Sequence, residues 1–315
     1  MNTVLGLVDT ADLGVTLCHE HVMTSSAGVA FSYPELADKR AIVESARAEL
    51  VATREGGVQT FVDLTTFDLG RDVRMLRELA QQTGMQIIVA TGTWLEVPRA
   101  FWQLGPDVVA KLYIRELEEG IDGTGIKAGL IKVANDVGGV TERGEVVLRA
   151  AARAHRTTGA PIFTHTWAPE RVGEQQIKIF EDEGVDLTRV CIGHSNDTLD
   201  IKYLIGILDK GCWLGLDRYP GGARNTPHWE ERTQVVKQLI DAGYSDRIIL
   251  SHDHTVAHGI ISIEELPLKR NENPDGFLFI SRNVLPRLKT LGVSEEDIHQ
   301  IMVDNPRYYL ESRAI

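Results

Sequence analysis

The sequence predicts an α/β fold, a (β/α)8 or TIM barrel formed by one domain that spans residues 1–315. Two observations predict it. Eight short apolar runs alternate with longer amphipathic stretches, and glycine directly follows most of the amphipathic stretches. Strand, helix and glycine repeated in this order indicate parallel βαβ units. A chain of 315 residues is long enough for a barrel of about 250 residues with insertions.

Each apolar run is too short for a helix and lacks polar alternation, which is typical of parallel strands covered on their outer face. An open doubly wound sheet would also accommodate such strands, but no glycine-rich nucleotide loop follows the first run. The eight runs are Val15 to Cys18, Thr60 to Leu64, Gln86 to Ala90, Ala128 to Lys132, Pro161 to Thr164, Val190 to Gly193, Cys212 to Asp217 and Arg247 to Ser251.

The amphipathic stretches predict helices on the outside of the barrel. Glycine just past the last apolar position is the usual left-handed helix terminator. The predicted helices, each with its terminating glycine, are Lys39 to Glu55 with Gly56 and Gly57, Arg71 to Gln82 with Gly84, Glu142 to Thr158 with Gly159, Glu174 to Glu183 with Gly184, Leu199 to Lys210 with Gly211, and Trp229 to Ala242 with Gly243.

Composition excludes several classes of protein. Acidic residues outnumber basic ones, 45 to 33, and the formal charge of −12 argues against a nucleic-acid partner. No apolar stretch approaches the roughly 20 residues of a membrane span. The N-terminus lacks the pattern of a signal peptide. Three cysteines without a CxxC pair do not form a disulfide framework, so we expect a cytoplasmic protein.

Ligand-type residues close four of the eight predicted strands. In barrels of this kind the active site lies at the carboxyl ends of the strands. His19 and His21 follow the first run, and alternate residues of an extended segment point the same way, so both can reach one ion. His165, His194 and Asp253 follow the fifth, sixth and eighth runs. Any one of them alone is typical of a hydrogen-bonded polar residue, but together they predict a metal site.

Lys132 lies in an otherwise apolar run, Gly129 to Ala134. A buried ammonium group is costly, so we expect the pKa of this lysine to fall. One interpretation is a lysine that extends its charged end to solvent at the strand end. The other is that the neutral amine reacts with carbon dioxide. The resulting carbamate is an anionic ligand with two oxygens that can bridge two metal ions.

Four segments around these residues resemble the phosphotriesterase family of the amidohydrolase superfamily. They are Leu17-Cys18-His19-Glu20-His21, Gly129-Leu130-Ile131-Lys132-Val133-Ala134, Thr164-His165-Thr166 and Ile192-Gly193-His194-Ser195. The resemblance runs over nearly the whole chain, to Asp304-Asn305-Pro306-Arg307. It covers both the phosphotriesterases and the phosphotriesterase-like lactonases.

The resemblance implies a binuclear centre with two divalent ions, for which zinc is the first expectation, with cobalt, manganese or iron in its place as further options. One ion would be buried, the other more exposed, and a hydroxide would bridge them and attack the substrate. The implied ligands are His19, His21 and Asp253 for the buried ion, His165 and His194 for the exposed ion, and N6-carboxylated Lys132 for both. Asp253 would also pass a proton toward the leaving oxygen.

Two further positions bear on the substrate, and they disagree. The arginine at position 218 is the residue type that the lactonases of this family carry there, whereas phosphotriesterases usually carry a histidine. That histidine relays a proton from the metal-bound aspartate. Arginine stays protonated and cannot accept this proton, so a relay through Asp197 would need another route. The tryptophan at position 94 is the residue type that phosphotriesterases carry there, and it would line the leaving-group side of the active site. Arg218 could instead be a structural partner of Asp217 or Asp197, and Trp94 a core aromatic residue.

We therefore expect a lactonase, acting on lactones such as N-acyl-homoserine lactones or on other carboxylic esters, with weaker phosphotriesterase activity. A phosphotriesterase (aryldialkylphosphatase) acting on organophosphate triesters is the second hypothesis. A one-metal deaminase and a non-catalytic barrel that only binds are less favoured. The resemblance implies a homodimer. Two segments, His254 to Gly276 and Pro220 to His228, are expected to form the substrate groove. His252, His254 and His258 flank Asp253, and we expect them to form hydrogen bonds around the metal ligands rather than to bind a third metal ion.

Overall fold

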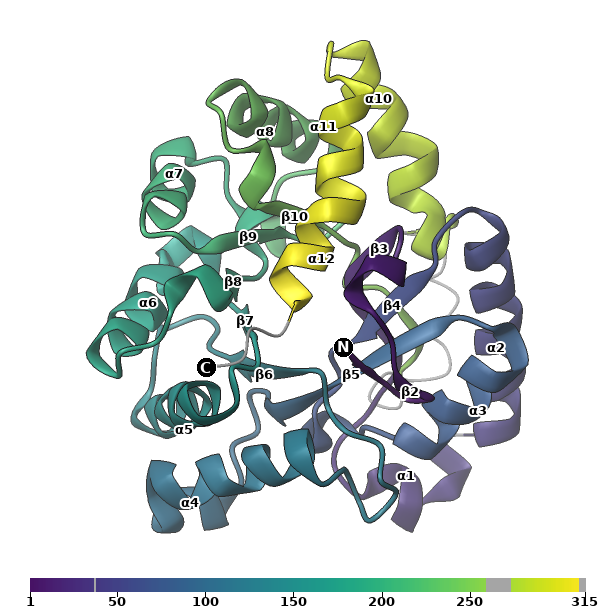
Figure 1. Ribbon diagram of the computed structural model, residues 1–315, viewed down its shortest axis with the longest axis vertical. Helices are drawn as coiled ribbons and strands as arrows, with labels where there is room; N and C mark the ends of the chain where they lie inside the picture. The colour runs from purple at the N-terminus through teal and green to yellow at the C-terminus, as the bar shows by residue number, and fades with distance from the viewer. Residues whose placement is uncertain (37, 259–272, 312–315) are drawn as a thin grey trace.

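The computed structural model describes residues 1–36, 38–258 and 273–311. Parallel strands form one curled sheet in the order β10-β9-β8-β7-β6-β5-β4-β3-β11, with helices around it (Figure 1). Its strands are β3 Thr16–Thr24, β4 Thr60–Asp63, β5 Gln86–Thr93, β6 Leu130–Ala134, β7 Ile162–His165, β8 Val190–Ile192, β9 Trp213–Leu216, β10 Ile248–Leu250 and β11 Thr255–His258. Each predicted apolar run overlaps one of the first eight, and the barrel is confirmed.

The eighth predicted strand continues past its expected end and closes the barrel. β10 and β11 are successive parts of it, and β11 pairs with β3 in parallel, Thr255 opposite His21. Between them the Asp253 amide donates to the His19 carbonyl at 3.0 Å. The segment His254 to Gly276, which we expected to contribute to the substrate groove, therefore begins with a strand at Thr255–His258 that pairs with β3. Residues 259–272 of the same segment lie outside the described residues.

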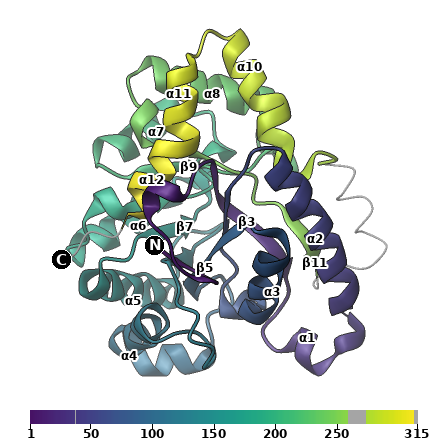
Figure 2. The same ribbon diagram turned by 45° about the vertical axis from the view of Figure 1, so that its right-hand side comes forward.

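Helices cover the outer face of the sheet, as Figure 2 also shows. They are α1 Val29–Ser32, α2 Lys39–Glu55, α3 Val73–Thr83, α4 Arg99–Glu118, α5 Glu142–Thr158, α6 Val172–Asp182, α7 Ile201–Asp209, α8 Trp229–Asp241, α10 Leu285–Thr290, α11 Glu295–His299 and α12 Asn305–Leu310. The bounds of α2 and α5 are those predicted. Both helices begin at a capping side chain, Asp38 and Thr141, which accepts from backbone amides of the first turn.

Two local expectations need correction. The helix that ends at Glu55 is followed by Gly56 at φ −74°, so Gly57 at φ 99° is the left-handed residue there. Helix α4 was not among the predicted helices. It is interrupted by Gly105, whose φ of 71° and ψ of 171° are not helical, directly before Pro106. This break divides the apolar pattern into two pieces.

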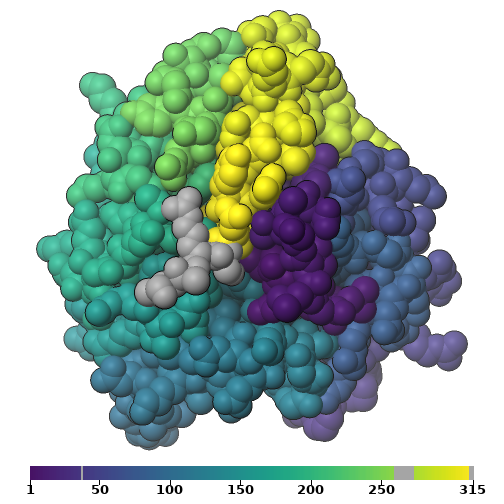
Figure 3. Space-filling view, viewed as in Figure 1, coloured from purple at the N-terminus to yellow at the C-terminus, as the bar shows by residue number. Residues whose placement is uncertain are grey.

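The amino end of the barrel is closed by both ends of the chain. In Figure 3 the N-terminal residues lie against the C-terminal helices on this face. Leu13 and Tyr309 join the buried cluster inside the barrel, which includes Phe163 and Cys191. A larger apolar cluster lies between strands and helices. Polar side chains lie at the opposite end of the barrel, where the strands have their carboxyl ends. Among the described helices, none has the length and apolar character needed to cross a membrane.

Candidate metal centre

The structure brings the six predicted ligands together at the carboxyl end of the barrel. They come from five places: His19 and His21 from β3, Lys132 from β6, His165 from the end of β7, His194 after β8, and Asp253 between β10 and β11. All are buried except Asp253, which is partly exposed. Three contacts link them: His19 Nε2 to Lys132 Nζ at 3.2 Å, His21 Nε2 to Asp253 Oδ1 at 3.1 Å, and His165 Nδ1 to His194 Nε2 at 2.9 Å.

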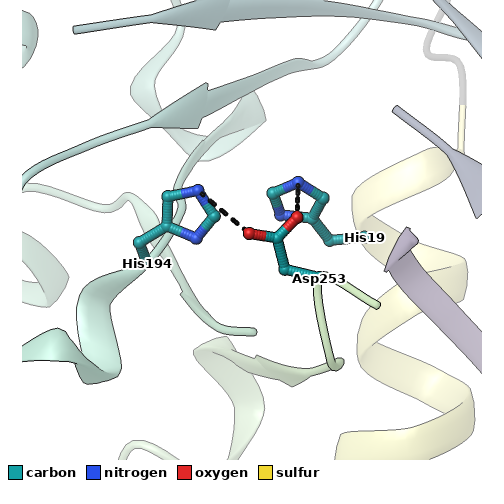
Figure 4. A group of neighbouring side chains, drawn as sticks. All are labelled: His19, His194 and Asp253. Carbon is teal, nitrogen blue, oxygen red and sulfur yellow. Dashed lines mark ion pairs between the residues drawn. The ribbon is translucent and has the colours of Figure 1, made fainter. Parts of the chain in front are cut away.

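The Asp253 carboxylate lies between two of the histidine rings (Figure 4). Its Oδ1 is 3.5 Å from His19 Nε2 and its Oδ2 is 3.8 Å from His194 Nε2. The ligand atoms of these three residues all lie within 4.8 Å of one another. Such a spacing is short enough for these three residues to take part in one metal centre.

Asp217 is a buried carboxylate behind the same rings. Its Oδ2 is 2.7 Å from His19 Nδ1, and its Oδ1 is 3.0 Å from His194 Nδ1 and accepts from the His194 backbone amide at 2.7 Å. From the sequence, Asp217 was expected only as one of two candidate partners of Arg218. The signal that could have identified it is an acidic residue directly after an apolar strand, at the same end of the barrel as the histidines.

The donor set of this centre fits divalent metal ions. The Nδ1 atoms of His19 and His194 face Asp217, and their Nε2 atoms lie toward Asp253 and His165, respectively. Imidazole nitrogens and carboxylate oxygens are usual ligands of zinc, cobalt, manganese and iron. Two imidazole nitrogens 2.9 Å apart, as in the His165–His194 contact, also suit a shared cation.

Burial holds these histidines in the neutral form that coordinates metals. It lowers the pKa of His19 well below its ordinary value, and the nearby Lys132 lowers it further. Burial, and to a lesser extent the charge of Arg218, lowers the pKa of His194 well below its ordinary value. Burial lowers the pKa of His165 to about 4. His165 Nε2 is 3.8 Å from Asp136 Oδ2 and has no hydrogen-bond partner among residues 1–36, 38–258 and 273–311.

Lys132 is buried in the third position of β6, with 1% of its surface exposed. The interpretation of a lysine that extends to solvent is therefore wrong. Its Nζ lies 3.4 Å from the Thr164 carbonyl and 5.0 Å from the centre of the Phe163 ring. Burial lowers its pKa to about 8. Within the described part of the chain, no carboxylate oxygen lies within 4.0 Å of this nitrogen.

Glu20 anchors the turn that carries Asp253. Its Oε1 accepts from Ser251 Oγ at 2.7 Å, from the His252 amide at 2.9 Å and from His252 Nδ1 at 2.6 Å, and its Oε2 accepts from the His254 amide at 3.0 Å. Asp253 itself has φ 54°, a conformation that few non-glycine residues adopt. The buried carboxylate of Glu20 thus holds the backbone on both sides of Asp253, which has a strained conformation.

The three neighbouring histidines form hydrogen bonds, but their partners are not the predicted metal ligands. His252 bonds Glu20 through Nδ1 and accepts from the Ile280 amide at 3.1 Å through Nε2. His254 Nε2 lies 2.9 Å from Glu49 Oε1, and His258 Nδ1 lies 3.2 Å from Thr24 Oγ1.

Arg218 joins two carboxylates at the mouth of the centre. Its Nε donates to Asp253 Oδ2 at 3.1 Å, and its Nη1 donates to Asp197 Oδ2 at 2.6 Å. Burial alone would lower the pKa of Arg218, but Asp197 and Asp253 raise it above its ordinary value. Burial would also raise the pKa of Asp253, but His19, His21 and Arg218 lower it well below the ordinary range. Of the two structural partners considered for Arg218, the structure shows Asp197.

Trp94 is partly exposed beside one of the predicted ligands. Its ring centre is 6.0 Å from that of His165, and the two planes are nearly perpendicular, at 87°. The Trp94 amide donates to both oxygens of Asp68 at 3.0 Å, which fixes the end of β5. The ring is therefore not part of the buried core.

A cavity of about 290 Å³ opens beside Asp253 and Arg218. Both segments predicted to form the substrate groove contribute to it. Its walls include Pro220, Gly221, Ala223, Arg224 and Thr226 from the first segment and His254, Thr255, Val256, His258 and Asn273 from the second. Trp167 also lines it, beneath the guanidinium of Arg224 at 4.2 Å from the ring centre.

Comparison with known proteins agrees with this geometry. The model of the phosphotriesterase family matches residues 1–310. This chain belongs to the phosphotriesterase family. A phosphotriesterase homology protein of Mycobacterium tuberculosis is 41% identical across 100% of this chain and 98% of its own length. An aryldialkylphosphatase of Saccharolobus solfataricus is 36% identical over 96% of each chain.

A more distant relative of this phosphotriesterase family member carries a different name. An N-acetyltaurine hydrolase of Mus musculus is 27% identical over 98% of this chain and 97% of its own length. The family resemblance inferred from the sequence is confirmed, and the protein is a hydrolase with a His and Asp group able to hold metal.

Proposed function

We propose that this hydrolase uses two divalent metal ions, zinc first among them, to hydrolyse lactones and related carboxylic esters, with weaker activity on organophosphate triesters. The ions would supply Lewis acidity and a more acidic water molecule. The residues that would hold them are His19, His21 and Asp253 for one, His165 and His194 for the other, and N6-carboxylated Lys132 for both. Support comes from the convergence of these side chains and from the absence of a carboxylate partner for Lys132 among the described residues.

The observation that carries the choice of substrate is the double contact of Arg218 with Asp253 and Asp197. Asp253 is ionised and can accept the proton of an attacking water molecule. Its Oδ2 faces a guanidinium group that is always protonated and cannot take this proton onward. The proton has to leave Asp253 by the substrate side.

An alkoxide leaving group can take that proton, because it is a strong base and needs protonation to depart. Ring opening of a lactone or cleavage of an alkyl ester therefore completes a proton cycle within the site. An aryl phosphotriester releases a weakly basic phenolate, so the proton must escape to solvent. Arg218 obstructs the path toward Asp197 by which it would escape, and for this reason we favour lactones.

The cavity beside Asp253 would hold the acyl part of the substrate, and Trp94, next to His165, would line the leaving-group side. Purified zinc-loaded protein should be tested on acyl-homoserine lactones, simple γ- and δ-lactones, aryl esters, N-acyl amino-sulfonates and phosphotriesters. Efficient turnover of triesters without hydrolysis of any lactone would refute the proposal.

Arg218→His tests the reasoning within one protein. A histidine can accept a proton, so the ratio of triester to lactone turnover should rise by about 10-fold or more. Arg218→Lys is the matched control, because lysine keeps the charge and does not relay. If both variants change the two activities in equal proportion, Arg218 does not determine the substrate.

Phosphotriester hydrolysis as the main activity is the second candidate. It is favoured by Trp94 beside His165 and by the 36% identity with an aryldialkylphosphatase. The same substrate panel separates the two. A bound metal content of one ion per chain would favour the one-metal deaminase instead. Full metal loading without any turnover would favour a barrel that only binds.

We also propose that the chain is one domain, that it forms a homodimer and that it works in the cytoplasm. Exposed Phe31, at 88%, and Tyr33, at 55%, offer apolar surface for a second copy. Light scattering should give twice the chain mass, and a monomer mass would contradict the dimer. Buried, unpaired cysteines suit a reducing compartment, which cell fractionation tests. A single unfolding transition is expected for one domain.

A further inference from the structure

Asp217 contacts one histidine from each half of the proposed binuclear centre. His19 is assigned to one ion and His194 to the other, and each places its Nδ1 within 3.0 Å of this carboxylate. We propose that Asp217 is a positioning residue that fixes the tautomers of both histidines, so that one carboxylate prepares both metal positions. This inference rests on the proposed function only for the assignment of the two ions.

Two glycines leave space for this carboxylate: Gly215 in β9 and Gly193 directly after β8. A Cβ on Gly215 would lie 2.9 Å from Asp217 Oδ2, and one on Gly193 would lie 3.1 Å from it. Neither glycine has a positive φ, so space rather than backbone conformation accounts for the residue type. Atoms of the Phe163 ring lie 2.8 Å and 3.0 Å from the same two Cβ positions, and Asp217 itself is fully buried.

Three nitrogen atoms converge on this carboxyl group: the His194 amide, His194 Nδ1 and His19 Nδ1. The His194 amide is a donor in every protonation state, and it meets Oδ1 at 2.7 Å. A carboxylate that accepts from this amide can accept from both rings as well, because it has about four lone-pair sites. The proton of each imidazole then lies on Nδ1, and each Nε2 is free to coordinate a metal ion.

Asp217→Asn should disturb the two metal positions unequally. The amide oxygen is expected at the Oδ1 position, because two donors of His194 point there. The amide nitrogen then faces His19 Nδ1 and donates to it. His19 must move its proton to Nε2, the atom that would coordinate the metal. His194 keeps its original tautomer.

The experiment has two readouts. Zinc bound per chain is measured against a competing chelator, and the proton positions of the histidines are read from long-range ¹H–¹⁵N spectra of metal-free, ¹⁵N-histidine-labelled protein. In Asp217→Asn one zinc ion should bind on the order of 10- to 100-fold more weakly while the other is retained. The spectra should show His19 changing tautomer and His194 unchanged, with His19→Gln used to assign the signal.

Asp68→Asn is the matched control. Asp68 is also a buried carboxylate after a strand, and it accepts from the Trp94 amide and Thr66 rather than from a histidine. This variant should keep both zinc ions and all tautomers. A purely structural role for Asp217 would weaken both zinc positions equally in Asp217→Asn and leave the tautomers unchanged, and that result would overturn the proposal.

Two outcomes are informative even without a folded variant. In the metal-free wild-type protein both His19 and His194 should carry their protons on Nδ1, and a proton on Nε2 of either would refute the inference. If the tautomers are as expected but the wild-type protein binds no second zinc ion, the proposed binuclear function fails while the role of Asp217 in fixing the rings remains.

Discussion

Glu20 offers the sharpest test of how the fold positions its site. Its carboxylate accepts four hydrogen bonds from the turn Ser251–His254 and is fully buried. In Glu20→Gln the amide oxygen can keep the three bonds of Oε1, but the amide nitrogen faces the His254 amide, so two donors oppose each other.

The magnitude follows from these contacts. An unpaired buried amide costs about 1–3 kcal/mol, and each bond that changes from a charged to a neutral acceptor loses about 1 kcal/mol. The total is about 3–5 kcal/mol after allowing for partial relaxation. At about 2 °C for each kcal/mol, Tm should fall by about 6–10 °C. Hydrolysis should fall as well, because the turn that carries Asp253 loosens.

Glu49→Gln is the control for this prediction. Glu49 bonds the same segment through His254 but is partly exposed, at 28% of its side chain. It should change stability by no more than about 0.5 kcal/mol. Both variants are compared by thermal unfolding and by turnover of the best substrate. Equal Tm values for Glu20→Gln and the wild type would show that the Glu20 network does not hold the turn.

Three further predictions concern packing, pH and metal. Gly193→Ala would place a Cβ 2.1 Å from the Thr164 carbonyl, so it should lower Tm and zinc content, whereas Gly206→Ala, with nothing within 4 Å, should leave both unchanged. Burial lowers the pKa of His155, so below pH about 6.5 this histidine is protonated in the unfolded chain but still neutral in the folded chain. Unfolding free energy should therefore fall as the pH falls, by at most about 1.4 kcal/mol per unit, and His155→Gln should flatten this part of a denaturant series. Chelation should abolish hydrolysis and lower Tm, both restored by zinc, and an unchanged Tm with full activity would exclude a metal centre.

The sequence predicted local features of this fold better than distant contacts. Each strand run and the bounds of α2 and α5 were visible in the apolar pattern and the glycine terminators. The strand Thr255–His258 was missed, because its partner β3 lies more than 230 residues earlier in the chain. Helix α4 was missed because Gly105 and Pro106 break its pattern.

In the site, too, the residues placed by local pattern were predicted and those defined by distant contacts were not. The six candidate ligands follow strands or lie at their ends, so the rule that carboxyl ends meet predicted their convergence. Asp217 and Glu20 could not be found in this way. Their roles depend on contacts to residues about 200 positions away, such as Asp217 to His19 and Glu20 to His252, which no local pattern encodes.

The central claim is that Lys132 becomes an anionic bridge between two cations. The most direct measurement is ¹³C NMR of zinc-loaded protein prepared with ¹³C-bicarbonate, together with the zinc content of the same sample. We predict one carbamate signal and two zinc ions per chain, with both the signal and the zinc pair lost in Lys132→Ala. Two zinc ions and full activity without a carbamate signal, or in Lys132→Ala, would contradict the account.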